Sequence, residues 1–132
     1  MSFPQRSRLK SPLRIRQILQ SPDSGRKRLR GFRVTWSKQE PSRRMPRLGK
    51  DPQFAFVVSR RSGPAVVRNR IKRRLREAVR LNRAIWPPEV AVVFFAEGGD
   101  VANLPFDTVN RLIGESLEWI DCHPPKSKEQ RA

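Results

Sequence analysis

The segment from Val66 to Arg83 constrains the fold more than any other part of the chain, because its apolar residues gather on one side only if it is a helix. These apolar residues recur at helical spacing and form one stripe: Val67, Ile71, Leu75, Ala78 and Val79. The residues on the opposite side are almost all basic: Asn69, Lys72, Arg73, Arg76, Arg80 and Arg83. The pattern predicts one amphipathic helix that packs against a core through its apolar stripe.

The charge of this predicted helix is one-sided. From Arg68 to Arg83, eight of sixteen residues are Lys or Arg, and Glu77 is the only acid. A solvated helix face normally mixes both signs, and cations in the first turn, such as Arg68 and Arg70, oppose the helix dipole. A docked polyanion would reverse that penalty, because guanidinium groups and free backbone N–H groups both bind phosphate. The pattern therefore favours nucleic-acid contact over a charged helix face that is only solvated.

The charge of the whole chain points the same way. The formal net charge is +17 over 132 residues. Residues 1–86 carry 25 Lys and Arg against 4 Asp and Glu, whereas residues 87–132 carry 4 against 8. A strongly basic balance is the electrostatic footprint of a nucleic-acid binder, so the first two thirds of the chain are expected to meet the polyanion.

The length suits a single small domain. We expect this domain over residues 9–121, after a disordered basic lead at 1–8 and before a polar tail at 122–132. The single cysteine excludes an internal disulfide framework. The sequence has no apolar run of about 18–20 residues, as a membrane span needs, and no signal-peptide pattern, so the cytoplasm is the expected compartment. Membrane-surface binding is disfavoured because the apolar stripe lacks Trp and Phe.

The remaining periodicity predicts a sheet with helices packed on it. Around the basic helix we expect further helices at Leu13–Gln20 and Phe106–Ile120, and strands at Phe32–Trp36, Phe54–Ser59 and Val90–Ala96. The proline-rich segment 37–53 is predicted to be a long mobile loop, and Glu97–Asp100 a turn. The strand–helix–strand unit suggests two parallel strands, and the general rule gives it a right-handed crossover.

Side chains suited to catalysis are sparse. His123 is the only histidine, and with Cys122 it offers too few ligands for a tetrahedral metal site. The carboxylates are scattered and mark no acid–base pair. Trp36, Trp86 and Trp119 could stack on bases, although core packing or a lid over the core is expected for at least two of them. The polypeptide itself is therefore predicted to carry no catalytic residues and no metal site.

The basic helix and the residues before it resemble the signature of the bacterial ribonuclease P protein subunit family. The resemblance is carried by Ser59-Arg60-Arg61, Gly63, Ala65-Val66-Val67 and Arg68-Asn69-Arg70-Ile71-Lys72-Arg73-Arg74-Leu75-Arg76-Glu77. It extends more weakly over Arg8 to Ile120. There, Arg8-Leu9-Lys10 followed by Ile15, Ile18 and Leu19 is similar to the family's first helix, and Gly31 to Trp36 to its early strand.

This resemblance implies a two-layer α/β sandwich of the α+β type, with a small mixed sheet. It also implies that the crossover carrying the basic helix is left-handed, against the general rule. The function implied is the removal of the 5′ leader from precursor tRNA. A large catalytic RNA cleaves with the help of Mg²⁺, while one protein per RNA binds both the ribonuclease P RNA and the leader. Neither a membrane nor DNA is an expected partner.

The family motif also implies which residues meet RNA. Those expected to face the catalytic RNA are Arg60, Arg61, Arg68, Asn69, Arg70, Lys72, Arg73 and Arg76. Those expected near the leader of precursor tRNA are Ile15, Leu19, Arg33, Thr35 and Trp36. The family usually has aromatic residues on its first helix, where this chain has Ile15 and Leu19, so leader contact by stacking departs from the family pattern. The next aromatic position falls on Thr35 or Trp36, depending on the register.

Two other functions fit part of the pattern. A ribosomal or other structural RNA-binding protein would also be small, basic and built around a sheet, without a role in turnover. A transcription regulator with a basic recognition helix fits less well, because the predicted strands flank the helix on both sides and leave no helix-turn-helix pair. Co-purification separates the first two functions: one predicts a catalytic RNA that cleaves precursor tRNA, and the other predicts whole ribosomal subunits.

Overall fold

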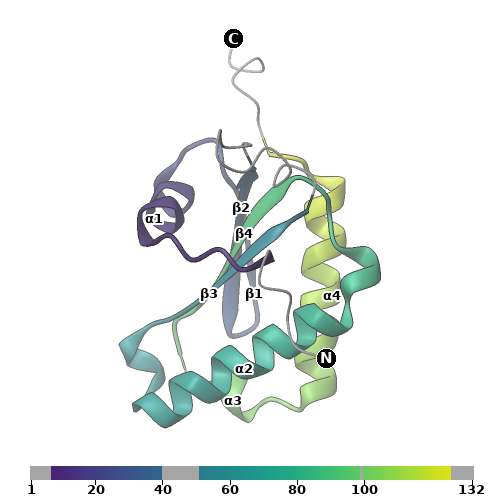
Figure 1. The fold of residues 1–132 in the computed structure, drawn as a ribbon. Coiled ribbons are helices and arrows are strands. Elements are labelled where there is room, and N and C mark those ends of the chain that lie inside the picture. Colours follow the sequence, from purple (N-terminus) through teal and green to yellow (C-terminus); the bar gives the residue numbers. More distant parts are fainter. Residues whose placement is uncertain (1–6, 40–50, 99, 126–132) are drawn as a thin grey trace.

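The structure, a computed structural model, describes residues 7–39, 51–98 and 100–125. Within these ranges the chain forms one four-stranded sheet with helices on both of its faces (Figure 1). The strands are β1 (Gly25–Leu29), β2 (Phe32–Lys38), β3 (Gln53–Val58) and β4 (Val90–Ala96). The helices are α1 (Pro12–Gln20), α2 (Ala65–Leu81), α3 (Asp100–Asn103) and α4 (Phe106–Cys122), with 3-10 helices η3 (Arg60–Ser62) and η4 (Arg83–Ile85).

The sheet is mixed, with the strand order β1-β2-β4-β3. β1 pairs with β2 and β2 with β4 in antiparallel orientation, whereas β3 and β4 are parallel. Parallel neighbours need a crossover connection, and here α2 supplies it. The predicted fold class, a small mixed sheet with helices packed on it, is confirmed; the handedness of the crossover stays a prediction.

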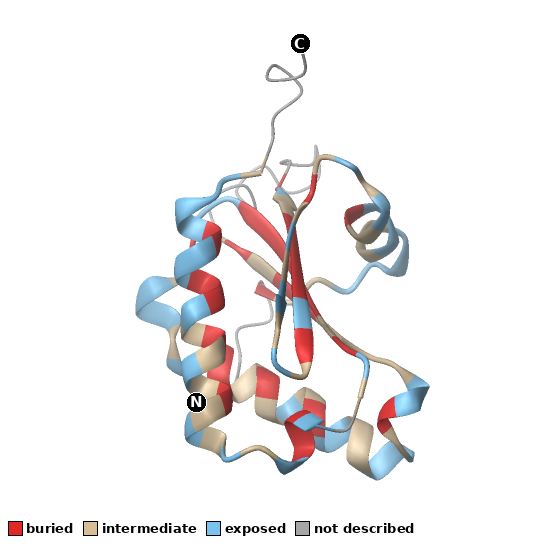
Figure 2. Ribbon diagram, turned by 180° about the vertical axis from the view of Figure 1, so that it is seen from behind, coloured by how far each residue is buried: buried red, intermediate tan, exposed pale blue. Residues whose placement is uncertain are grey.

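The two faces of the sheet bury different amounts of apolar surface. The larger core lies between one sheet face and the apolar stripes of α2 and α4, and includes Trp36, Phe54, Phe94, Leu75 and Ile113. On the opposite face, α1 covers a smaller cluster formed by Ile18, Ala55, Ala91 and Val93. Figure 2 shows buried residues on the strands and on the inner sides of the helices. The face that carries α1 is therefore the thinly covered one.

The predicted basic helix is confirmed as α2, whose apolar stripe is buried. Its C-terminal end is fixed by Asn82. The side-chain amide of Asn82 donates to the carbonyl of Ala78 and to Oδ1 of Asn110 in α4, both at 2.8 Å. A side chain that satisfies a last-turn carbonyl ends a helix, and the chain continues as η4. The predicted range 66–83 thus differs from α2 only at its ends.

The strand β1 is missing from the sequence prediction. Its residues, Gly-Arg-Lys-Arg-Leu, offer no apolar alternation, and it forms because a tight hairpin pairs it with β2. Gly31 in the turn has a φ of +85°, a left-handed conformation that glycine adopts without strain. A strand held mainly by backbone pairing leaves little trace in hydrophobic periodicity.

Several predicted element boundaries also differ from those in the structure. The ends of the predicted loop 37–53 belong to strands, since β2 runs to Lys38 and β3 begins at Gln53; residues 40–50 lie outside the described ranges. A short helix, α3, begins at Asp100, where only a turn was predicted. Cys122 ends α4 rather than opening a tail, and residues 126–132 are not described.

The basic lead predicted at 1–8 is in part an ordered segment. Arg8 forms a parallel bridge with Phe54, and the backbone N–H of Leu9 donates to the Phe54 carbonyl at 2.8 Å. This segment therefore extends the sheet beyond β3, while residues 1–6 lie outside the described ranges. In the part of the chain that the structure describes, no helix is long and apolar enough to cross a bilayer.

Candidate nucleic-acid interface

The outward side of α2 is basic because its apolar stripe faces the core. Among the residues predicted to face RNA, Asn69, Arg70 and Arg73 are exposed, while Arg68, Lys72 and Arg76 are partly exposed. η3 precedes the helix and adds Arg60 and Arg61, both exposed. The structure therefore gathers all eight predicted residues on one helix and the turn that leads into it.

Among the described residues, the N-terminal end of α2 has no side-chain cap and no acid in its first turn. Pro64 occupies the N-cap position without a side-chain hydrogen bond, and the first turn contains no acid. The Nε of Arg68 is buried and has no hydrogen-bond partner among the described residues. Free backbone N–H groups, the positive end of the helix dipole and several guanidinium groups meet at this end, an arrangement that suits phosphate.

Two arginines of α2 do not belong to this outward face. Arg74 points toward α3, where its guanidinium donates to the carbonyl of Ala102 at 2.8 Å and to that of Leu104. Burial, and then the nearby charge of Arg70, lower the pKa of Arg74. Arg80 donates to both carboxylate oxygens of Glu77, and the hydrogen bond lowers the pKa of Glu77. Arg74 therefore links α2 to α3 and the residue that follows it, and the charge of Arg80 is paired with that of Glu77.

Arg76 lies at the side of α2 that meets the sheet edge. Its guanidinium carbon is 5.8 Å from the centroid of the Phe56 ring, a cation–π arrangement. Burial, followed by the charge of Arg8, lowers the pKa of Arg76. The basic surface of α2 thus continues onto the ordered N-terminal segment that pairs with β3.

The residues predicted near the leader separate onto two faces of the sheet. Arg33 and Thr35 of β2 lie on the face that carries α1, and Ile15 and Leu19 of α1 pack against the small cluster there. Thr35 is only 3% exposed, whereas Arg33 is exposed. Trp36 alternates to the other face, is 2% exposed, and donates from Nε1 to the carbonyl of His123 at 2.8 Å. The assignment of Trp36 to leader contact is therefore wrong, because its ring is buried in the core.

The side chains of the other two tryptophans also make contacts within the protein. Trp86 lies 4.9 Å from the ring of Phe54 and donates to the carbonyl of Val79 at 2.8 Å. Trp119 is 39% exposed, but its ring stacks on His123 with centroids 3.9 Å apart and lies 3.7 Å from Nζ of Lys27. The expectation that at least two of the three tryptophans pack on the core or cover it is confirmed.

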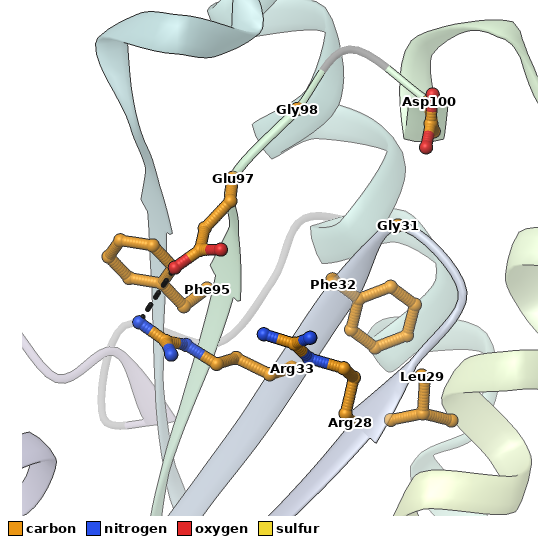
Figure 3. A pocket seen from close by; sticks show the side chains of 9 residues that line it. All are labelled: Arg28, Leu29, Gly31, Phe32, Arg33, Phe95, Glu97, Gly98 and Asp100. Carbon is orange, nitrogen blue, oxygen red and sulfur yellow. Dashed lines mark ion pairs between the residues drawn. The ribbon is translucent and has the colours of Figure 1, made fainter.

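The sequence prediction named only Arg33 from one row of side chains on the sheet face that carries α1. In register across the strands, Arg28 pairs with Arg33, Arg33 with Phe95, and Phe95 with Val57. The row lies beside a hollow of about 330 Å³ at the end of the β1–β2 hairpin (Figure 3). Phe95 was not predicted because β4 is apolar on both faces, so its sequence shows no alternation. Arg28 was not predicted because it lies in β1, the strand that the sequence did not reveal.

Potential metal ligands are dispersed among the described residues. No set of three or more His, Cys, Asp and Glu side chains lies close enough together in these ranges to hold a metal ion. His123 is used locally, with its Nδ1 2.9 Å from the carbonyl of Trp119.

Comparison with known proteins relates both the sequence and the fold to one family. The family model described as Ribonuclease P matches residues 3–120. A ribonuclease P protein component of Roseiflexus castenholzii is 41% identical over 76 residues, which are 58% of this chain and 57% of that protein. A component of the same name from Symbiobacterium thermophilum is 56% identical over 73 residues, which are 53% of this chain and 60% of that protein. The chain thus spans somewhat more than half the length of these curated relatives.

Solved structures show the same fold. The RNase P protein from Thermotoga maritima superposes with a TM-score of 0.71 at 22% identity, covering 86% of this chain and 96% of that one. The RNase P protein of Staphylococcus aureus gives a TM-score of 0.66 at 18% identity, covering 86% and 94%. At these identities the likeness concerns the arrangement of strands and helices.

Proposed function

The chain belongs to the ribonuclease P protein family, and on that basis we propose that it binds the ribonuclease P RNA and supports removal of the 5′ leader from precursor tRNA. The observation that carries this proposal is the outward face of α2 together with η3. Eight side chains of the family signature lie there, and seven of them are cations. Lys and Arg side chains at a helix start, beside free N–H groups, match the phosphates of a folded RNA.

The proposed division of labour assigns the chemistry to the RNA. The α2 face offers N–H donors, and the oxygens of its acid, Glu77, accept from Arg80. Mg²⁺ prefers oxygen ligands, so this face does not fit the ion, and we assign Mg²⁺ to the RNA subunit. The protein would then act by neutralising phosphates and positioning RNA. We further propose one protein per RNA and a cytoplasmic location.

Leader contact is proposed on the sheet face that carries α1. The groups available there are the partly exposed side chains of Ile15 and Leu19 and the exposed guanidinium of Arg33. Thr35 lies on the same face but is buried. Trp36 is excluded from the proposal by its place in the core.

Reconstitution tests the proposed function. Purified protein, freed of RNA by nuclease, is incubated with precursor tRNA, with and without ribonuclease P RNA and Mg²⁺. We expect accurate 5′ cleavage only when the RNA is present, and a lower Mg²⁺ requirement when the protein is added. Cleavage by nuclease-treated protein alone would contradict the division of labour. Recovery of whole ribosomal subunits with the tagged protein, and no effect on cleavage, would favour the structural RNA-binding alternative.

A further inference from the structure

Two hollows lie side by side where the connection from α2 to β4 meets the end of α4. The larger, of about 530 Å³, is lined by η4, Trp86 and the last turns of α4. The smaller, of about 330 Å³, is lined by Val90 and Ile120 among others. Pro88 and Asp121 line both, so we call them the paired hollows. Each volume falls in the range of about 300–1,000 Å³ that is usual for pockets that hold ligands.

The wall of the larger hollow toward η4 is apolar and faces solvent. η4 contains no buried residue, and its Ile85 is 37% exposed. Ala84 and Pro88 are exposed as well, and Leu81, at the end of α2, is 51% exposed. Single exposed apolar residues are ordinary, but several that gather beside a hollow mark an interaction surface.

The rim of the paired hollows is acidic. Glu118 and Asp121 lie in the last two turns of α4, Glu89 precedes β4, and all three are exposed. None of them forms an ion pair with a described residue, although the chain has 29 Lys and Arg against 12 Asp and Glu. Lys38 is the one cation among the described residues that line the hollows. In so basic a chain, acids without an internal partner keep their charge for a cationic group from outside.

The paired hollows lie away from the helix end where phosphate is expected. α2 runs from η3, which carries Arg60 and Arg61, to the side of α4, where Asn82 contacts Asn110 (Figure 1). Its 17 residues make a helix about 25 Å long. Carboxylates without a partner repel phosphate, so the paired hollows disfavour RNA and suit a protein instead.

A second copy of this chain is a poor occupant. The surface with which it could meet the acids is the outward face of α2, which RNA covers if the proposed function holds. Two copies, each with a formal net charge of +17, also repel each other. The occupant is therefore a different protein.

We propose that the paired hollows dock a segment of another protein that presents basic side chains beside apolar ones. The apolar side chains fill the hollows against Ile85 and Pro88, and the cations meet Glu118 and Asp121. The chain then holds RNA toward one end of α2 and a protein at the other. This inference goes beyond the proposed function, because it concerns a surface with no role in RNA binding.

Selection from a library of random peptides tests the chemistry of this surface. Peptides are selected on the full chain free of RNA. Those that also bind the hollow variant, Glu118→Lys with Asp121→Lys, are discarded, which removes acidic peptides that bind α2. We expect the remaining peptides to combine Lys or Arg with Leu, Phe or Trp. A selection that leaves no peptides, or only peptides without basic residues, would overturn the proposal.

A matched control separates docking from general attraction by charge. Asp107 and Glu115 are exposed on α4 but line neither hollow, so Asp107→Lys with Glu115→Lys changes the net charge equally. The dissociation constant of a selected peptide should rise at least roughly tenfold in the hollow variant and in Ile85→Ser, as for loss of a central interface contact. It should change little in the control. Equal weakening in the control, or no effect of Ile85→Ser, would overturn the proposal.

Cys122 gives a readout that needs no variant to fold. It is the only cysteine of the chain, is exposed and lines the larger hollow. A saturating peptide should slow alkylation of Cys122 by a maleimide, and unchanged alkylation would place the peptide elsewhere and overturn the proposal. The hollow variant should bind the ribonuclease P RNA no more weakly than the parent. Weaker binding would place RNA at the paired hollows and overturn the proposal, whereas a parent protein that binds no RNA would overturn only the proposed function.

Discussion

At the scale of single residues, the arginines of α2 perform different tasks although the sequence presents them as one basic run. Arg73 is exposed on the outward face, Arg80 is paired with Glu77, and Arg74 donates to two carbonyls near α3. The sequence predicted that this face meets a polyanion, because its charge is one-sided. It did not identify Arg74 as an internal link, since the direction of that side chain depends on where α3 lies.

Arg74→Met tests this difference. Methionine keeps much of the aliphatic stem, so the substitution chiefly leaves the carbonyls of Ala102 and Leu104 without their donor. We expect the free energy of unfolding to fall by about 1–3 kcal/mol, because two partly buried hydrogen bonds from a charged donor are lost. Arg73→Ala, at an exposed position, should change it by about 0.5 kcal/mol or less. Urea unfolding of both variants measures the difference, and equal losses would contradict the assigned roles.

At the scale of elements, hydrophobic periodicity predicted the amphipathic helices. It did not predict elements or side-chain directions that depend on pairing between strands. α2 and α4 each bury one stripe, so their spacing alone located them. β1 is basic and depends on its hairpin with β2, so no local signal marked it. The uniformly apolar β4 was found, but which of its side chains face α1 could only follow from the sheet register, and Phe95 was missed for that reason.

Leu75→Ala tests the packing of α2 as an element. Leu75 is fully buried in the core between the sheet and the helices. Its truncation should lower the free energy of unfolding by about 2–5 kcal/mol, because transfer and cavity costs add. Thermal melts should therefore place Leu75→Ala well below Arg73→Ala. The opposite order would mean that the helix presents a different face to the core.

At the scale of the whole molecule, basic residues dominate the first part of the chain and acidic residues the last part. The fold brings basic residues from the first part together on two surfaces. The basic residues of α2 and η3 are exposed or partly exposed and form the first surface. The row of Arg28, Arg33 and Phe95 on the sheet forms the second. The sequence predicted the first surface through the family signature. The second required the sheet register, because Arg28, Arg33 and Phe95 come from three different strands.

The salt dependence of RNA binding tests the central claim most directly, namely that the outward face of α2 docks on RNA through phosphates. The dissociation constant for ribonuclease P RNA is measured at several salt concentrations for the parent, for Arg70→Gln with Lys72→Gln, and for Arg111→Gln as a control on α4. Each neutralised phosphate contributes about 0.7–0.9 to the magnitude of the slope of log K against log salt. We predict a steep slope for the parent and the control, and a slope smaller by roughly one to two units for the double variant. An affinity independent of salt, or an unchanged slope in the double variant, would contradict the account.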